Sequence, residues 1–324
     1  MTLSVWAVSD GRAGIENQVL GLAEAVARLT AATITTKRVA YRGPIGRVPQ
    51  MLNLAPRAAL VEPLTPPWPN LWIAAGRATL PLSARVRRWS GGRTFVIQVQ
   101  APRWPLRLFD LVVAPNHDAV NGANVVGVTG SPNRVTPERL AEAVAAFASR
   151  IEPLPHPRVA ALIGGKSKAF DLTPARAATL ADQIASAVIA SGGSVLATVS
   201  RRTPEAARAI FTERLGRLPG WVWDGGGANP YFAFIAAADA ILVTEDSANM
   251  ATEAAATGKP VHILSLEGGT PKFARFHAEL RSLGVSRPFT GDLTPWTYPP
   301  LRDTDRAAAE VLKAYRATLA VGAR

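Results

Sequence analysis

The fold of this chain is decided by residues 239–260, which read DAILVTEDSANMATEAAATGKP. An apolar run at 240–243 leads into an acidic and polar turn and then into an alanine-rich segment that ends in Gly-Lys-Pro. This order predicts a buried strand, a turn and a helix, as in the βα unit of a parallel sheet. The unpaired N–H groups and the dipole at the start of such a helix favour an anion. The stretch is either an anion-binding turn or an ordinary βα unit in which Asp246 or Ser247 caps the helix.

Outward from this unit, apolar runs and helical patterns alternate at the rhythm of parallel α/β sheets. We expect one domain over 1–152 and a second over 153–300, divided at the three prolines of 152–157, which form a stiff connector. An amphipathic helix within 302–324 is expected to pack back on the first domain. The predicted fold is α/β, with two Rossmann-like doubly wound parallel-sheet domains that face a cleft.

The expected strands of the first domain are 4–9, 34–40, 71–75, 94–99, 111–114 and 125–128, and those of the second are 158–163, 194–199, 221–223, 240–243 and 261–265. We expect the strand at 261–265 to be the last. Threonine–proline pairs that begin at Thr136, Thr173 and Thr203 predict capped helix starts.

Composition narrows the class of protein. The chain has 324 residues, 48% of them hydrophobic, and no cysteine. A disulfide scaffold, a thiolate zinc site, an iron–sulfur cluster and a cysteine nucleophile are therefore excluded. The N-terminus lacks the basic start of a signal peptide, and no apolar stretch approaches the roughly 20 residues of a membrane-spanning helix. We expect a cytoplasmic protein, soluble or peripheral on the inner face of the membrane.

The net charge of +12 is uneven, because residues 1–150 hold 17 of the 36 lysines and arginines but 8 of the 24 acidic residues. This asymmetry favours an anionic partner such as a membrane surface, although a compositional bias toward arginine is a competing explanation. No nucleic acid is expected, since no recognition motif is present. The basic segment 42–72, with Met51, Leu52 and Leu54, either rests on an anionic membrane or is a surface loop with a short helix.

Three more loops of the second domain follow expected strands and suit an anion. The turn GGKSK at 164–168 offers backbone N–H groups and ammonium charge, and SRRT at 200–203 offers guanidinium groups. The loop DGGGANPY at 224–231 is flexible enough to face a base or a sugar. Each loop alone is as well explained by a capped helix start or an ordinary turn, but four such turns at successive strand ends favour a ligand site.

In the first domain the equivalent turn reads DGRAGIENQ at 10–18, and Gly76-Arg77 ends another strand. His117 lies in a third strand-end loop, where a solvated surface histidine is the better interpretation than a general base. The D-x-D string at 303–305 precedes an alanine-rich helix, so N-capping explains it better than metal binding.

These motifs together resemble the mitochondrial fission (elongated mitochondria) family, and the resemblance covers essentially the whole chain. More distantly, the second half is similar to the donor domain of GT-B glycosyltransferases. That likeness implies a donor diphosphate and ribose near Ser247, Asn249 and Glu253. The full set of donor-binding residues that we expect is Gly164, Gly165, Lys166, Ser200, Arg201, Arg202, Asn229, Tyr231, Thr244, Glu245, Asp246, Ser247, Asn249, Met250 and Glu253.

On the acceptor side the expected residues are Gly11, Arg12, Gly14, Asn17, Gln18, Gly76 and Arg77. The family pattern leads us to expect a histidine where Ile15 stands, so the catalytic base falls to Asp10 or Glu16. The resemblance implies transfer of a nucleotide-activated sugar to a cell-envelope or lipid-linked acceptor, with no metal and no cofactor. The alternative is a non-catalytic, membrane-associated scaffold that recruits partners. A dehydrogenase-type nucleotide-sugar epimerase is disfavoured, because G-x-G-x-x-G after the first strand and a Tyr-x-x-x-Lys pair are missing.

Overall fold

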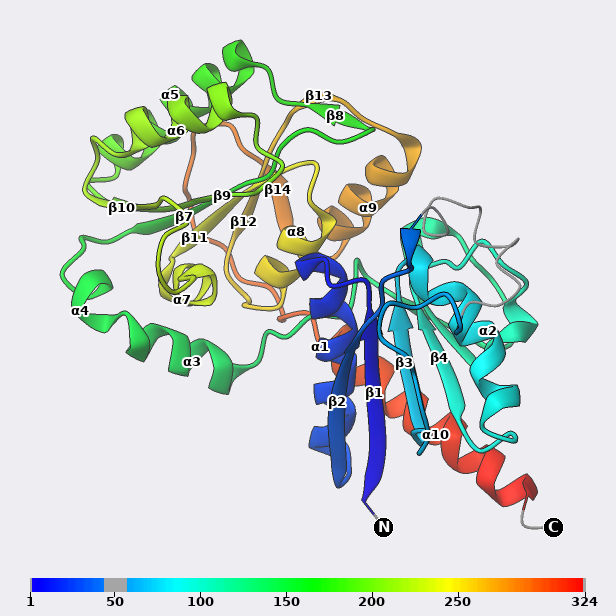
Figure 1. Cartoon of the computed structure of the whole chain (residues 1–324). Coiled ribbons are helices and arrows are strands. Elements are labelled where there is room, and N and C mark those ends of the chain that lie inside the picture. Colours follow the sequence, from blue (N-terminus) through cyan, green and yellow to red (C-terminus); the bar gives the residue numbers. More distant parts are fainter. Residues whose placement is uncertain (1, 44–56, 323–324) are drawn as a thin grey trace. The chain divides into compact units, whose positions relative to one another are not determined.

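The structure is a computed structural model that describes residues 2–43 and 57–322, and the side chains of 321 and 322 are not described (Figure 1). Two compact units are present: Met1–Arg134 with Arg302–Arg324, and Val135–Leu301. The division at 134/135 lies earlier than the 152/153 expected from the sequence, because α3 (Pro137–Ala146) packs against α7 (Tyr231–Ala237) of the second unit. Met51, Leu52 and Leu54 lie outside the described residues.

The first unit contains a parallel sheet in the order β2-β1-β3-β4-β5-β6. Its strands are β1 (Leu3–Ser9), β2 (Ala32–Arg38), β3 (Leu71–Ala75), β4 (Phe95–Val99), β5 (Leu111–Pro115) and β6 (Val125–Val128). Its helices are α1 (Ala13–Leu29), η3 (Arg77–Thr79), α2 (Leu80–Trp89), η4 (Leu106–Leu108), η5 (Asn116–Asp118) and α10 (Asp303–Gly322).

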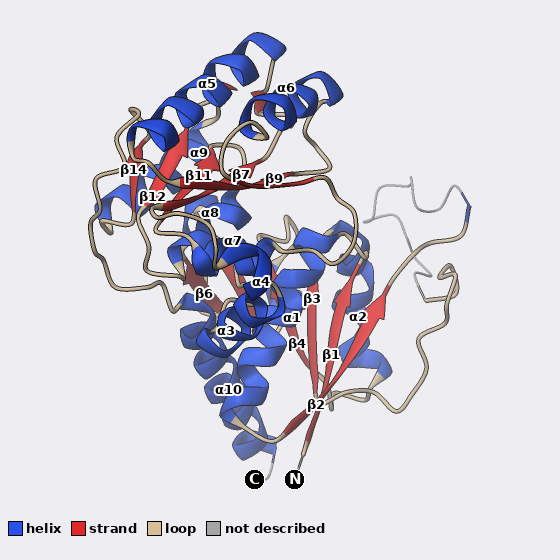
Figure 2. Ribbon diagram, turned by 90° about the vertical axis from the view of Figure 1, so that its left-hand side faces the viewer, coloured by secondary structure: helices blue, strands red, loops and turns tan. Residues whose placement is uncertain are grey.

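Both faces of this sheet are covered, and β3, β4 and β5 are accordingly buried at every position. Helices α1 and α10 pack together on one face, as Figure 2 shows, and bury Val26 and Val311 there. The C-terminal helix is fixed by the ion pair of Asp305 with Arg28 at 2.5 Å and by a hydrogen bond from Asn133 N–H to the Thr304 hydroxyl. It therefore belongs to the first unit although the second unit separates it in sequence.

The second unit has a parallel sheet in the order β10-β9-β7-β11-β12-β14. Its strands are β7 (Arg158–Ile163), β9 (Ser194–Val199), β10 (Gly220–Trp223), β11 (Ala240–Thr244), β12 (Val261–Leu264) and β14 (Ser286–Pro288), and a small antiparallel pair joins β8 (Phe170–Asp171) to β13 (Glu267–Gly268). Its helices are α3 and α7 as above, α4 (Ala148–Ile151), α5 (Pro174–Ala190), α6 (Glu205–Leu215), α8 (Ala248–Ala255) and α9 (Pro271–Ser282).

Helices also cover both faces of the second sheet. On one face α5 and α6 bury Leu180 and Phe211, and on the other α7, α8 and α9 bury Ile235, Ala251 and Phe276 (Figure 1). The α8 segment packs on the sheet through small side chains, those of Ala251, Ala254 and Ala255. Within the described residues no helix is both long and apolar enough to cross a bilayer.

Three details differ from the sequence-based expectations. The strand at 261–265 is not the last, because β14 follows it; that short strand is an edge strand with no apolar run, and its Pro288 is tolerated there. Helices α2 and α9 were not expected. Thr136 and Thr173 cap their helices, as predicted, but Thr203 does not cap α6, because its hydroxyl donates to the carbonyl of Gly164.

The strand orders locate the places where ligands bind in such sheets. In the first unit the chain winds in opposite directions from β1 and β3, and in the second from β7 and β11. Ligands of open α/β sheets bind beyond the carboxyl ends of the strands at this switch point. The switch points here are followed by the turns at 10–18 and 76–77 and by those at 164–168 and 245–247.

Candidate functional site

The two turns at the switch point of the second unit are bonded to each other. The Gly164 N–H donates to the Thr244 hydroxyl at 2.7 Å, and the Gly165 N–H donates to the Asp246 carboxylate at 3.1 Å. The Thr244 hydroxyl in turn donates to Asp246 at 2.8 Å. A Cβ at Gly164 would lie 2.1 Å from Asp246 Oδ1, so only glycine allows this approach.

Asp246 also binds the guanidinium of Arg202 at 2.8 Å, and its own side chain is fully buried. The N–H donors that the glycine turn was expected to present to phosphate are thus taken by groups of the chain itself: Gly165 by the Asp246 carboxylate and Gly164 by the Thr244 hydroxyl. Asp246 is not the helix cap considered as one alternative, since Ser247 caps α8 by accepting the Met250 N–H at 3.4 Å. The two turns are therefore closed against each other by internal hydrogen bonds and do not form an open anion-binding loop. The residues involved are Gly164, Gly165, Thr244 and Asp246.

The cations of the neighbouring turns differ in what they bind. Lys166 pairs with Asp171 at 3.2 Å, and Arg202 pairs with Asp246. Ser200 accepts the backbone N–H of Arg202 at 3.1 Å, which fixes the turn after β9. Arg201 is exposed and forms no ion pair or hydrogen bond through its side chain within the described residues. Its charge is available to an anion at this strand end.

Glu245 and Glu253, both expected in the donor site, have different environments. Glu245 turns toward α9: its carboxylate accepts the Leu266 N–H at 2.9 Å and its carbonyl accepts Nε2–H of His277 at 2.8 Å. Glu253 is 7% exposed on α8 and accepts the hydroxyl of Tyr231 at 2.6 Å. Burial raises the pKa of Glu253 to about 7, although the hydrogen bond from Tyr231 lowers it.

Tyr231 is held by the start of α7, where Asn229 accepts its backbone N–H at 3.0 Å. Burial and the nearby Glu253 raise the pKa of Tyr231 well above its ordinary value, so the phenol stays protonated and donates. The remaining lone pairs of Glu253 are free to accept hydroxyl groups. The sequence predicts both residues individually, but their pairing across 22 positions comes from the fold.

In the first unit the two candidate bases are each held by an arginine. Arg12 binds Asp10 at 2.7 Å from the same turn. Arg38, at the end of β2, binds both oxygens of Glu16 at 2.7 and 2.8 Å and holds the pKa of Glu16 below its usual range. Arg38 was not among the site residues predicted from the sequence, although its place near the end of a strand was a usable signal. Glu16 is therefore a poor proton acceptor near neutral pH.

The other acceptor-side residues gather around the same switch point. Gly76 has a φ of +90°, and a Cβ there would lie 3.3 Å from Asp10 Oδ2, so β3 ends directly beside Asp10. Gly11, Arg12 and Arg77 are exposed and Gly14 and Asn17 are half-buried, whereas Gln18 is buried and accepts a hydrogen bond from Gln100 at 2.9 Å. The prediction that His117 is a solvated surface histidine is wrong. Its side chain lies in η5, directly after β5, and is only 5% exposed.

The two aspartates of the D-x-D string at 303–305 bind groups of the first unit. Asp303 accepts the Thr129 N–H at 2.6 Å and Asp305 pairs with Arg28. Across residues 2–43 and 57–322, no three His, Asp or Glu side chains cluster as a metal site.

Comparison with known proteins identifies one family and one fold. A family model described as "Mitochondrial fission ELM1" matches residues 13–315. The Arabidopsis thaliana "Mitochondrial fission protein ELM1" is 33% identical over 270 residues, which cover 75% of this chain and 63% of the relative. The chain thus spans under two thirds of that relative. An uncharacterized Rickettsia prowazekii protein, RP120, is 24% identical, with coverage of 96% and 98%.

Among solved structures, the chain is similar to Methanocaldococcus jannaschii UDP-GlcNAc 2-epimerase in complex with UDP-GlcNAc and UDP. The TM-score is 0.54 at 11% identity, over 97% of this chain and 99% of that one. At this identity the likeness concerns the fold alone. Together with the two doubly wound sheets it confirms the predicted GT-B-like class of two Rossmann-like units.

Proposed function

The chain belongs to the mitochondrial fission ELM1 family, and from its site geometry we propose that it binds a nucleotide-activated sugar in the second unit and transfers the sugar to a hydroxyl acceptor. The observation that carries the proposal is Glu253: a buried carboxylate, held by Tyr231, on the first helix beyond the switch-point strand β11. A carboxylate in this position can accept the paired hydroxyls of a ribose. Its neighbours on α8 supply the helix start that favours a diphosphate.

The donor roles follow from which groups are free. Arg201 meets the diphosphate, because Arg202 and Lys166 are paired with carboxylates of the chain. The N–H groups at the first turn of α8, after Ser247, supply further donors. The loop at 224–230 lies after β10 and faces the base or the sugar. Asp246 acts through Arg202 and Gly165 by holding these turns in place.

On the acceptor side we assign the base to Asp10 in preference to Glu16. The Arg38 guanidinium binds both oxygens of Glu16 and holds the pKa of Glu16 below its usual range, whereas the Arg12 guanidinium binds only Oδ2 of Asp10. In the reaction the acceptor oxygen bonds to the anomeric carbon while the bond from that carbon to the diphosphate oxygen breaks. The electron pair leaves with the nucleoside diphosphate, and the acceptor proton passes to Asp10.

The test is titration of the full chain with UDP, other nucleoside diphosphates and UDP-sugars, followed by thermal unfolding. A true donor at a hundred times its dissociation constant stabilises the fold by about 2.7 kcal/mol. Arg201→Gln and Glu253→Gln should weaken binding at least tenfold. Arg217→Gln, an exposed arginine on the same unit paired with Glu213, is the matched control. If no nucleotide stabilises the protein, the donor-site proposal fails.

A scaffold without catalysis is the second candidate, and one observation favours it: each carboxylate offered as a base already forms an ion pair. A membrane-associated role recruits partners through the surface of the chain rather than through Asp10. Asp10→Asn separates the two functions, since it abolishes sugar transfer but leaves a scaffold function intact.

A further inference from the structure

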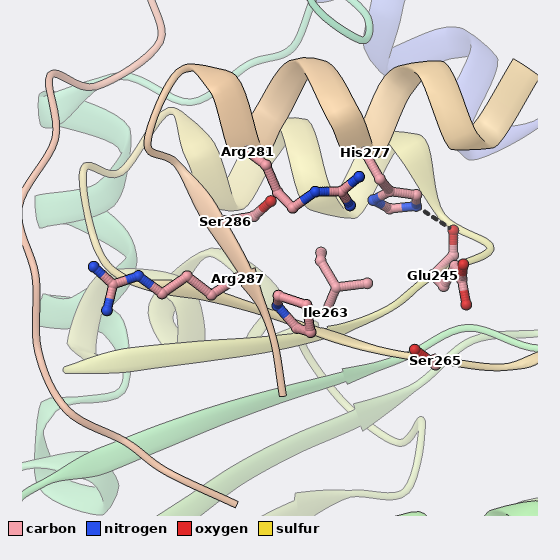
Figure 3. A pocket seen from close by; sticks show the side chains of 8 residues that line it. Glu245, Ile263, Ser265, His277, Arg281, Ser286 and Arg287 are labelled. Atoms are coloured by element: carbon pink, nitrogen blue, oxygen red, sulfur yellow. Dashed lines mark hydrogen bonds between the residues drawn. The ribbon is translucent and has the colours of Figure 1, made fainter. Parts of the chain in front are cut away.

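A small cavity in the second unit lies apart from the proposed donor residues Arg201 and Glu253. It measures about 60 Å³ and lies between β12, α9 and β14 (Figure 3). That volume is several times the roughly 10–15 Å³ that one water molecule needs. Its lining residues are Glu245, Ile263, Ser265, His277, Arg281, Ser286, Arg287 and Pro288.

Two buried polar atoms of the lining lack a hydrogen-bond partner among the described residues. They are Nδ1 of His277 and Oγ of Ser286, and the two residues are 4% and 3% exposed. A buried polar atom without a partner costs about 1–3 kcal/mol, so such atoms in a cavity indicate a bound water, ion or other ligand. Both belong to elements that fix them firmly, α9 and the first position of β14.

The protonation of His277 follows from its other nitrogen. Nε2 lies 2.8 Å from the carbonyl oxygen of Glu245, which can only accept, so Nε2 carries the proton. Burial lowers the pKa of His277, which keeps the ring neutral. Nδ1 is therefore an acceptor, and its partner must bring a hydrogen.

The charged groups at the edge of the cavity indicate the charge of the ligand. Figure 3 shows the guanidinium of Arg281 reaching toward the His277 ring, while Arg287 points away. Arg287 lies over the ring of Trp296, 4.2 Å from its centroid. Arg281 has no ion-pair partner in the described part of the chain, so its cation is available to an oxyanion.

We propose that this cavity binds an oxyanion that keeps a proton, namely hydrogen phosphate. Its oxygens accept from Arg281 and from the Ser286 hydroxyl, and its P–OH donates to Nδ1 of His277. The Glu245 carboxylate at the rim disfavours a fully deprotonated anion and accepts a second hydrogen where the ligand has one. The ligand would also touch the turn after β11, because Glu245 of that turn lines the cavity.

Anion choice provides the test. At pH 7.5 inorganic phosphate retains a P–OH, whereas sulfate and methyl phosphate do not, since phosphomonoesters lose their last proton near pH 6. Calorimetric titration of the full chain at matched ionic strength should show saturable phosphate binding, at least tenfold tighter than sulfate or methyl phosphate. A phosphomonoester as the natural source would instead bind equally well and would overturn the stated selectivity.

Variants place the site. Arg281→Gln and Ser286→Ala should each weaken phosphate binding at least fivefold, and phosphate should shift the ¹⁵N resonance of His277 Nδ1. Arg287→Gln is the matched control at the same rim, and Arg201→Gln tests whether phosphate binds the donor site instead. The proposal is overturned if phosphate gives no saturable heat, as in a cavity filled by water alone, or if either control loses as much affinity as Arg281→Gln. None of these outcomes depends on nucleotide binding.

Discussion

The carboxylate of Asp246 lies 2.8 Å from the guanidinium of Arg202, and it closes the turn after β11 against the turns after β7 and β9. One buried side chain thereby joins three strand ends at the switch point of the second sheet. The predicted anion cradle is filled, at this place, by an anion that the chain carries itself.

Replacing Asp246 by alanine should lower the free energy of unfolding by about 2–3 kcal/mol, because Gly165 N–H and the Thr244 hydroxyl lose a buried acceptor. Urea unfolding measures this loss. Asp182→Ala is the matched control, since Asp182 is 65% exposed and its pair with Arg214 contributes little. Equal losses in both variants would contradict the structural role of Asp246.

Between pH 4.5 and 6.5 the contributions of Glu253 and His262 to the free energy of unfolding should change with pH in opposite directions. The folded pKa of Glu253, about 7, exceeds its ordinary 4.5, so the folded state binds more protons there and stability falls as pH rises. Burial lowers the pKa of His262 to about 4 from 6.5, so the unfolded state binds more protons and stability rises with pH.

Single variants should reveal how Glu253 and His262 each change the free energy of unfolding with pH. In Glu253→Gln the free energy of unfolding should rise by about 2 kcal/mol from pH 4.5 to 6.5, with His277 acting in the same direction as His262. In His262→Gln the free energy of unfolding should change in the opposite direction to this, falling from pH 4.5 to 6.5 when measured relative to the parent. Urea titrations at several pH values test both, and parallel profiles for the parent and the two variants would refute the assignment.

Tyr231→Phe should raise the pKa of Glu253 further, because the phenol hydrogen bond is what lowers it. The carboxyl would then be largely protonated at neutral pH and would donate rather than only accept. We expect nucleotide affinity at pH 7 to drop about fivefold and to recover partly at pH 8.5. A carboxyl ¹³C titration of Glu253 measures the shift directly, and an unchanged midpoint would show that the hydrogen bond is unimportant.

Gly76→Ala should destabilise the first unit more than Gly92→Ala. Both glycines have positive φ, +90° and +79°, so each variant is strained, and Gly76 with a ψ of 159° lies in a region essentially restricted to glycine. Only at Gly76 does the new Cβ meet neighbours, at 3.3 Å from Asp10 Oδ2 and from Ile15. The difference between the two unfolding midpoints measures the added cost of the Gly76 backbone conformation and of crowding against Asp10, and equal midpoints would refute the prediction.

Local sequence signals predicted most of the elements, because buried parallel strands are uniform apolar runs and threonine–proline pairs mark helix starts. The same signal at Thr270-Pro271 could have revealed α9, where Thr270 caps the helix as Thr136 and Thr173 do. The short β14 offered no such signal. Thr203 shows the opposite case, in which a cap motif is redirected by a carbonyl 39 positions away.

By itself the sequence determined that the chain forms two doubly wound α/β units, and it placed the polar turns at the ends of their strands, since periodicity and turn chemistry are local properties. Only the tertiary structure decided which of those polar groups are free. Asp246 reaches Arg202 and Gly165 across strand-end turns, Arg38 at the end of β2 reaches Glu16 on α1, and Tyr231 on α7 reaches Glu253 on α8. Sequence spacing carries no record of such distances, so the division between occupied and available side chains belongs to the fold.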